Sequence, residues 1–412
     1  PAQPISARPL GPARRNSPAP ATIRPPPVGC AAAAFPLLPF HPSLCQFMYF
    51  RFFPSDSCDH MHLYAHVCGD FGTAGMPGVF KRFFDVVVGM ARAIHVLTLP
   101  MAVYVDDCAL IGAIRGVVDR EMVCFHNFAA TVCGVYFKAI KDRVASQEQL
   151  VLGFVWDSRT LTRALETYKL ESYLQLWSAL IKQPTWTLRE MQSLAGKMQR
   201  ACMTLPPGAA SMLMALFALM AGLRLPWHRR RVSRQVKSDM KWMHYLLGLN
   251  MGKGYFSYSL FGAGPEVRSD ASKSGRFAGG GWVSQCGRYD FFSYGSRASR
   301  HLIDYLEGDV VTACAASMGH LWRGLRIPFG VDNMAFEASA VKGRSRVSRL
   351  NELVRELFAL QVKFGFVFDF FWLSSEDNLL ADHLSRDREL QFLLDVFVTG
   401  KKGVYMYVKR VR

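Results

Sequence analysis

Two adjacent carboxylates, Asp106 and Asp107, stand between two short apolar runs in residues 101–112. This pattern predicts two strands joined by a tight turn, with the Asp pair at the turn. Neighbouring carboxylates between hydrophobic strands repel each other and lose hydration, so their charged forms need a cation between them. Two Mg²⁺ ions at such a pair can hold a nucleotide triphosphate and a primer end. The alternative is an ordinary hairpin turn that contains Asp.

A second set of acids lies in the C-terminal part of the chain, at strand ends or on helices: Asp270, Glu307, Asp332 and Asp382. Each would be expensive to bury alone. On elements that face one sheet, they form a site for two Mg²⁺ ions about 4 Å apart, which activates water and stabilises the leaving oxygen of a phosphodiester. Gly308 and Asp309 follow Glu307 and should weaken its helix, so Glu307 fits least well. The alternative is four unrelated surface acids.

Hydrophobic periodicity predicts the elements that position both sets. Around the second set, strands are predicted at 267–272, 277–283, 289–294, 327–332 and 366–373, and helices at 301–318, 350–364 and 378–386. Before the Asp pair, a glycine-rich loop at 70–77 should open a helix at 78–94. After it come an amphipathic helix, a strand at 152–156, and a helix opened by a capping box at Thr187 and Glu190.

Tyr104-Val105-Asp106-Asp107 resembles the Tyr-X-Asp-Asp motif of reverse transcriptases, and the loop before it resembles their Phe-Gly-x-x-x-x-Pro motif. Residues 194–197 are similar to a Leu-x-Gly-Lys turn of the thumb. The resemblance implies that Asp106 and Asp107 are catalytic metal ligands. It also implies substrate-binding roles for five residues: Phe71, Gly72, Pro77, Tyr104 and Lys141. For Lys141, a solvated surface lysine is the alternative.

The second set of acids resembles the Asp-Glu-Asp-Asp order of retroelement ribonuclease H, with Asp-Ala-Ser, Asp-Asn and Asn-x-x-Ala-Asp-x-Leu-Ser-Arg in the corresponding elements. The resemblance implies catalytic, metal-binding roles for all four acids, and substrate contacts for Asn333 and Asn378. It implies two Mg²⁺ or Mn²⁺ ions in each active site. The resemblance covers about residues 45–393 and is nearest to the polymerase of long-terminal-repeat-like retrotransposons. The sequence motifs are most similar to those of the tyrosine-recombinase (DIRS-like) group.

The implied fold is an α+β polymerase palm and a helical thumb and connection, followed by an α/β ribonuclease H-like domain with a mixed sheet. The expected divisions are a Pro/Ala/Arg-rich disordered segment at 1–45, a partial palm at 46–160, thumb and connection at 161–260, the ribonuclease H-like domain at 261–392 and a basic tail at 393–412.

One departure from the family concerns the palm, which needs a third aspartate on a strand upstream of the glycine-rich loop. Residues 1–55 contain no Asp or Glu, and the basic fingers that bind the incoming nucleotide are missing. DNA synthesis by this chain is therefore doubtful. Because the chain begins at Pro1, we expect an N-terminally truncated fragment or a processed product.

Charge favours a nucleic-acid partner, because 49 Lys and Arg residues against 32 Asp and Glu give a net charge of +17. Basic residues at 228–241, flanked by Trp227 and Trp242, suit a surface that follows a phosphate backbone, or an ordinary solvated face. The ten cysteines form no CxxC pair, which favours an intracellular setting, cytoplasm or nucleus, over secretion. The apolar stretch at 209–223 is too short to span a bilayer and predicts a buried helix.

Five possible metal ligands fall at even positions in residues 58–68: Cys58, His60, His62, His66 and Cys68. On one strand they would share a face but spread over roughly 33 Å, too far for one ion. Their spacing matches no established zinc finger, so an ordinary strand or hairpin is favoured over a zinc site.

The sequence supports three hypotheses. The first is a reverse transcriptase–ribonuclease H fragment that uses an RNA template, RNA–DNA hybrid and deoxynucleotide triphosphates, with other element-encoded proteins as further partners. The second is a catalytically dead nucleic-acid-binding relic of a retroelement. The third is a basic membrane-surface or structural protein, which leaves both sets of carboxylates unexplained and is the poorest fit; we expect no membrane partner.

Overall fold

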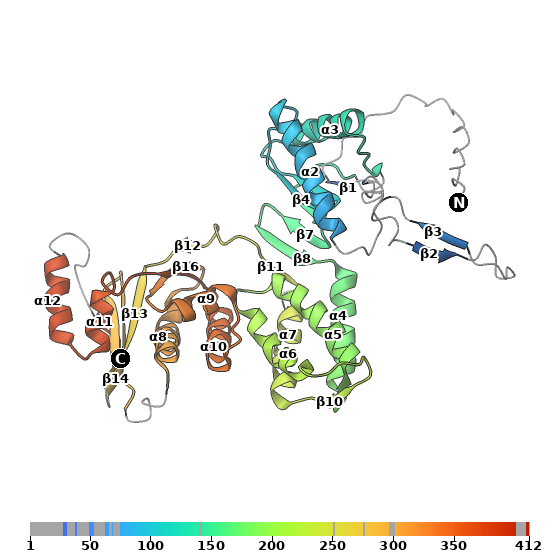
Figure 1. Ribbon diagram of the computed structural model, residues 1–412. Coiled ribbons are helices and arrows are strands. Elements are labelled where there is room, and N and C mark those ends of the chain that lie inside the picture. The colour runs from blue at the N-terminus through green and yellow to red at the C-terminus, as the bar shows by residue number, and fades with distance from the viewer. Residues whose placement is uncertain are drawn as a thin grey trace, which may run out of the picture. The chain divides into compact units, whose positions relative to one another are not determined.

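The structure is a computed structural model that describes residues 28–30, 38, 49–52, 62–65, 68, 75–139, 142–249, 252–274, 277–295, 301–400 and 409–411. The chain divides into two compact units, Pro1–Ser146 and Gln147–Arg412. Both units mix helices with strands, and the strands form several separate sheets, so the predicted α+β class is confirmed (Figure 1). Among the described helices, none is long and apolar enough to cross a membrane.

In the first unit, two helices and a short sheet enclose an aromatic core. The helices are α2 (Met76–Ala93) and α3 (Arg115–Val132), and the sheet has the order β1 (Val28–Cys30), β5 (Asp107–Leu110), β4 (Met101–Tyr104). Phe80, Phe84 and Phe125 are completely buried between them. A separate antiparallel pair joins β2 (Tyr49–Phe52) to β3 (His62–Ala65).

The hairpin that carries the two aspartates differs from the prediction by one position. Tyr104 pairs with Asp107, so the turn consists of Val105 and Asp106, and Asp107 is the first residue of β5. Val105 has a φ of 54°, in the left-handed region that β-branched residues rarely adopt. The turn therefore places a costly backbone conformation between Tyr104 and the carboxylates.

The second unit begins with a four-stranded sheet in the order β11 (Lys253–Tyr255), β8 (Thr162–Leu165), β7 (Phe154–Asp157), β6 (Glu148–Val151). The strand predicted at 152–156 starts too early. Leu152 and Gly153 both have positive φ and form the two-residue turn between β6 and β7. Such a turn matches the right-handed twist of the paired strands.

Four helices follow: α4 (Thr167–Ile181), α5 (Leu188–Ala201), α6 (Met214–Met220) and α7 (Arg234–Leu249). The predicted capping box is confirmed, because Thr187 and Glu190 bond each other's backbone N–H groups. The turn predicted at 194–197 is wrong, since these residues lie inside α5. Residues 209–223 form a 3₁₀ turn (Ala209–Leu213) and then α6, which pack around the buried Trp177 and Trp186 rather than forming one long helix. A short pair, β9 (Thr185–Thr187) and β10 (Arg229–Arg231), closes this part.

The remainder of the second unit is a seven-stranded mixed sheet with helices on both faces (Figure 1). Its order is β12 (Gly262–Ala263), β16 (Leu325–Val331), β13 (Val267–Ser274), β14 (Phe277–Ser284), β15 (Arg288–Ser293), β18 (Lys409–Arg410), with β17 (Val367–Trp372) on the other side of β16. One face packs on α8 (Ile303–Met318), α9 (Met334–Lys342) and α10 (Ser348–Phe364). The opposite face packs on α11 (Leu379–Ser385) and α12 (Glu389–Gly400). The elements predicted here exist, with ends shifted by one or two residues.

Candidate active site

Three of the four C-terminal acids meet at one end of the mixed sheet. One carboxylate oxygen each from Asp270, Glu307 and Asp332 lies within 4.8 Å of the other two. Asp270 is in the middle of β13, and Asp332 directly follows β16. Because β13 and β16 are parallel neighbours, both strands deliver their acids toward the same end of the sheet. Asp270 and Glu307 are 5% and 3% exposed, so these charges are not ordinary surface acids.

Glu307 reaches the cluster from α8, where its Oε1 accepts a hydrogen bond from the backbone N–H of Ala271, at 3.0 Å. The expectation that Gly308 weakens this helix is wrong, since α8 runs unbroken from Ile303 to Met318. A Cβ at Gly308 would lie 2.7 Å from Leu353 Cδ1 and closer still to the ring of Phe336. Glycine is thus needed here so that α9 and α10 pack tightly on α8, which fixes the side of α8 that carries Glu307.

Asp332 is held by the last residue of β17 and by the segment that follows this strand. Ser375 donates a hydrogen bond to Asp332 Oδ2 at 3.0 Å, and the indole of Trp372 donates to the Asp332 carbonyl, also at 3.0 Å. The buried Asn378 donates to the carbonyl of Ser269 at 2.8 Å, which ties the segment to β13. Sequence reasoning selected Asn378 but missed Ser375 and Trp372, because nothing in their spacing indicates that β17 returns beside β16.

Asp382 lies on α11 and is not part of the three-acid cluster. Its Oδ1 accepts from Arg386 Nε at 2.7 Å. The close approach of α11 to the sheet depends on Gly281, which is opposite Asp270 in the register of β13 and β14. A Cβ at Gly281 would lie 2.8 Å from the backbone carbon of Leu384 and 2.9 Å from the Ser385 nitrogen. The hydroxyl of Ser272 also donates to the Ser385 carbonyl at 2.6 Å.

Burial and mutual repulsion both oppose ionisation in this cluster. Burial, together with the charges of Asp332 and Asp382, raises the pKa of Asp270 to about 7, against a hydrogen bond from Ser385 and the charge of Arg386. Burial and the neighbouring charges of Asp270 and Asp332 also raise the pKa of Glu307 well above its usual range. Near neutral pH the cluster therefore retains a proton unless another cation compensates its charge.

The cluster fits a hard divalent cation. All three side chains offer oxygen ligands, the type that Mg²⁺ and Mn²⁺ prefer. Asp270 Oδ2 and Glu307 Oε2 are buried and have no hydrogen-bond partner among the described residues, so each has an oxygen available for coordination. A buried carboxylate oxygen without a partner is costly. The donor set thus accommodates a metal ion.

The other predicted acids, Asp106 and Asp107, lie in the first unit and belong to no cluster of three possible ligands among the described residues. On the side of β5 away from β4 lies β1, and the residue of β1 opposite Asp107 is Cys30. Tyr104 is 64% exposed at the end of β4. In the described part of this sheet, therefore, the neighbouring strand offers no carboxylate opposite the Asp pair.

Some of the remaining predicted residues lie outside the described residues, and two others stand at the starts of helices. Phe71, Gly72 and Lys141 lie outside the described residues, as do Cys58, His60 and His66, so the proposed nucleotide loop and the zinc hypothesis stay predictions. Pro77 stands in the first turn of α2, as expected. Asn333 caps α9, because its Oδ1 accepts from the Phe336 N–H at 2.9 Å.

Comparisons with known proteins give structural resemblances only. No protein-family model matches the sequence, and no curated protein matches it. Three solved structures of foamy viral protease-reverse transcriptase are similar, each at 13% sequence identity: a complex with RNA/DNA hybrid, a dRH complex with double-stranded DNA, and a complex with double-stranded DNA. Their TM-scores are 0.44, 0.43 and 0.44, and they cover 83%, 84% and 86% of this chain. The chain spans 43%, 56% and 68% of those chains.

Proposed function

We propose that the second unit is a ribonuclease H that hydrolyses the RNA strand of RNA–DNA hybrids with two divalent metal ions. The observation that carries the proposal is the convergence of Asp270, Glu307 and Asp332 within 4.8 Å at one end of the mixed sheet. A cluster of buried acids with raised pKa values has no evident structural benefit, since each would be cheaper on the surface. It suits a site whose charge is balanced by bound cations.

In this proposal, Asp270, Glu307 and Asp332 hold the metal ions, and Asp382 completes the set from α11. Divalent ions in such a site supply an activated water and stabilise the leaving oxygen of the phosphodiester. The protein keeps the ligands in place: Ala271 N–H orients Glu307, and Ser375 orients Asp332. Arg386 pairs with Asp382 and offsets part of its charge until the metal ions bind.

The first unit is then part of a reverse transcriptase palm, with Asp106 and Asp107 as the remaining catalytic acids and Tyr104, Phe71, Gly72, Pro77 and Lys141 around the nucleotide. We do not assign DNA synthesis to this chain alone. Residues 1–55 lack any carboxylate, and Cys30 pairs with Asp107 where a third acid would be useful. In this proposal, the complete polymerase uses an RNA template and deoxynucleotide triphosphates. It belongs to a DIRS-like element and acts in the cytoplasm or nucleus, with other element-encoded proteins as partners.

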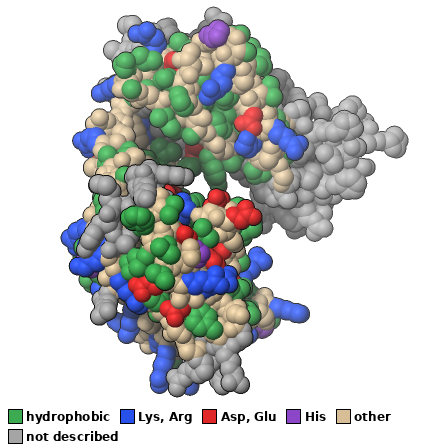
Figure 2. All heavy atoms as spheres, turned by 90° about the vertical axis from the view of Figure 1, so that its left-hand side faces the viewer, with side chains coloured by type: hydrophobic (Ala, Val, Ile, Leu, Met, Phe, Trp, Pro, Cys, Tyr) green, Lys and Arg blue, Asp and Glu red, His purple; other side chains and the backbone are tan. Residues whose placement is uncertain are grey.

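A second candidate is a catalytically dead nucleic-acid-binding relic. The net charge of +17 supports binding without requiring turnover. On the face in Figure 2, Asp and Glu side chains lie beside Lys and Arg side chains, so the charge forms no uninterrupted basic surface there. The relic is expected to bind hybrid in a salt-sensitive manner with no metal-dependent cleavage.

Cleavage of an end-labelled RNA–DNA hybrid by the full chain, in Mg²⁺ or Mn²⁺, separates the two candidates. We expect cleavage that Asp270→Asn and Asp332→Asn each reduce by at least about 100-fold, as removal of a principal catalytic group does. Glu376→Gln, a change at an acid outside the cluster, is the matched control and should retain activity. Hybrid bound but not cleaved would favour the relic, and cleavage that survives Asp332→Asn would overturn the site assignment.

A further inference from the structure

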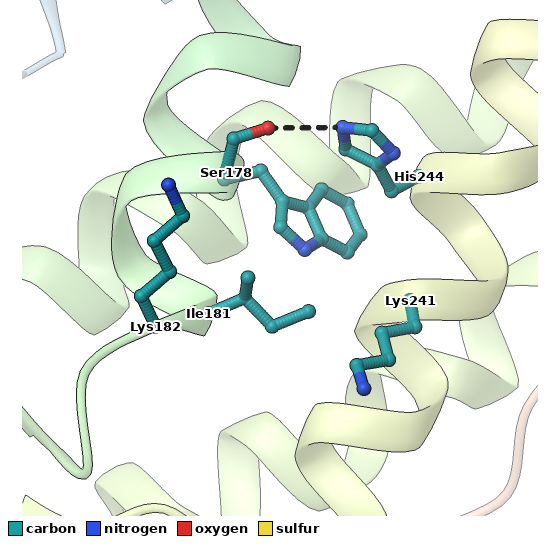
Figure 3. Close-up of a pocket in the computed structure, with 6 residues that line it drawn as sticks. Ser178, Ile181, Lys182, Lys241 and His244 are labelled. Carbon is teal, nitrogen blue, oxygen red and sulfur yellow. Dashed lines mark hydrogen bonds between the residues drawn. The ribbon is translucent and has the colours of Figure 1, made fainter.

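The second unit contains a cavity on the surface between α4 and α7, away from the acids of the candidate active site. Its volume is about 230 Å³, and it is lined by Trp177, Ser178, Ile181, Lys182, Lys241 and His244. Figure 3 shows Lys182 and Lys241 on opposite sides of the cavity, one at the end of α4 and the other on α7. Ser178 and His244 close one end through a 3.3 Å hydrogen bond.

The lining residues favour an anion. Lys182 and Lys241 are exposed cations, the hydroxyl of Ser178 is a potential donor, and none of the lining residues is acidic. The C-terminal end of α4 opposes an anion, because helix C-termini carry a partial negative charge. That opposition is small, because the indole N–H of Trp186 already donates a hydrogen bond to the Leu180 carbonyl oxygen, at 2.7 Å. Two full positive charges outweigh it.

Trp177 provides an independent indication of a ligand. Its side chain is 1% exposed and lines the cavity, yet its indole Nε1–H has no acceptor among the described residues. The ring is otherwise well placed, packing edge-on against His244 with centroids 5.5 Å apart. A buried donor without an acceptor is rare and costly in native proteins. An oxygen of a bound anion would satisfy it once the atoms that cover Nε1 move aside.

We propose that this cavity binds a phosphate group. A tetrahedral oxyanion has acceptors for the ammonium groups of the lysines, which are the charged donors of this lining, and a further acceptor for the indole N–H. The volume of the cavity leaves room for several waters beside it, at about 30 Å³ per water. Phosphate can come from a nucleic-acid backbone or from free phosphate and nucleotides, and the backbone case rests on the proposed function.

A neighbouring cavity favours the backbone as the source. It is about 370 Å³ in volume and is lined by Ser238, Lys241, Trp242 and Tyr245, so Lys241 belongs to both cavities. Tyr245 is 61% exposed on α7. A lysine between an anion cavity and the exposed ring of Tyr245 suits a nucleic-acid strand, whose phosphate binds in one cavity while a base stacks beside the other.

The first test measures binding of an RNA–DNA hybrid in EDTA over a salt series. The double variant Lys182→Gln/Lys241→Gln should lower affinity by roughly 10-fold at 0.1 M salt and reduce the salt slope by about 1, for the one phosphate contact that is lost. The matched control, Lys253→Gln/Lys342→Gln, removes the same charge from exposed positions that line neither cavity and should leave the slope unchanged.

The second test titrates sodium phosphate against sodium chloride of equal ionic strength and follows the indole N–H resonances, with Trp177→Phe and Trp242→Phe for assignment. A saturable shift of the Trp177 resonance that the double lysine variant abolishes supports a site for free phosphate. Loss of hybrid affinity in that variant, without a phosphate shift, supports the backbone. If neither effect occurs, the cavity proposal is overturned, even where hybrid is still cleaved. A phosphate shift in a protein that binds no hybrid would keep the cavity and overturn the proposed function.

Discussion

Arg386 Nε lies 2.7 Å from Asp382 Oδ1, one helical turn away at the end of α11. The pair sits beside the acid cluster, because the charges of both residues act on Asp270 in opposite directions. Asp382 raises the pKa of Asp270, and Arg386 lowers it. Arg386 therefore acts as a built-in counter-charge to a site that carries several carboxylates. Under the proposed function, it competes with a metal ion for Asp382.

Removal of this counter-charge should strengthen metal binding. We expect Arg386→Gln to bind Mn²⁺ about 5-fold to 10-fold more tightly, because the loss of a nearby positive charge at a partly exposed site is worth roughly 1 kcal/mol. Calorimetric titration of the metal-free full chain measures it. Arg388→Gln, which removes an exposed charge two residues away, is the control and should change the affinity little. Equal affinities for Arg386→Gln and the natural chain would show that the guanidinium does not compete with the metal.

The raised pKa of Asp270 predicts a pH-dependent cost to stability. The unfolded chain releases this proton near pH 4 and the folded chain near pH 7, so the folded state binds more protons between these values. The free energy of unfolding therefore falls as pH rises through this window, by at most about 4 kcal/mol. In metal-free buffer at pH 8, Asp270→Asn should be more stable than the natural chain. Urea denaturation at pH 5 and pH 8 checks this, and a natural chain no less stable at pH 8 would contradict it.

A substitution at Gly281 tests whether the packing of α11 on the sheet requires a residue without a side chain at this position. Gly281→Ala should destabilise the second unit by about 1–3 kcal/mol, because the new methyl group meets backbone atoms that cannot move aside. Gly196→Ala is the matched control. Gly196 lies inside α5 with nothing within 4 Å of its Cβ position, so the same change should stabilise by about 0.5–1 kcal/mol. Thermal unfolding of both variants measures the difference. A Gly281→Ala variant that is no less stable than the Gly196→Ala variant would refute the packing argument.

Local signals predicted the elements of the second unit well, because hydrophobic periodicity and capping act over short distances. The capping box at Thr187 and the strand of residues 267–274 illustrate this. The errors arose where glycine has two uses. Gly308 suggested a weak helix, but it makes room for Phe336, and Gly153 was placed in a strand although its positive φ forms a turn. Sequence alone does not say which use applies.

The candidate site shows the same limit. Asp270, Glu307 and Asp332 were selected from residue type and order, and the structure brings them together. Ser375 was not, since its role depends on β17 returning next to β16, a long-range pairing. The cavity at Trp177 was also out of reach, because its lining comes from two helices about 60 residues apart in the chain.

His126 gives the first unit an expected sensitivity to acid. Burial lowers its pKa to about 4, its ring stacks on Phe137 at 3.9 Å, and its Nδ1 is 3.9 Å from Asp142 Oδ2. Burial also raises the pKa of Asp142, so both groups favour their neutral forms. The unfolded chain protonates the histidine near pH 6.5 and the folded chain only near pH 4. The stability from His126 is thus complete above pH 6.5 and is lost as pH falls toward 4.

Replacement by an apolar ring isolates this effect from that of Asp142, whose raised pKa acts on stability in the opposite direction. Between pH 7 and pH 4.5, His126→Phe should gain about 2–3 kcal/mol of stability relative to the natural chain. Hydrogen exchange of peptides from α3, corrected for intrinsic rates, measures the opening of this unit. His95→Asn changes an exposed histidine in the same unit and keeps a residue tolerant of its positive φ, so it should leave the pH dependence unchanged. Parallel curves for His126→Phe and the natural chain would mean that the pKa of His126 in the folded state is close to its ordinary value of 6.5.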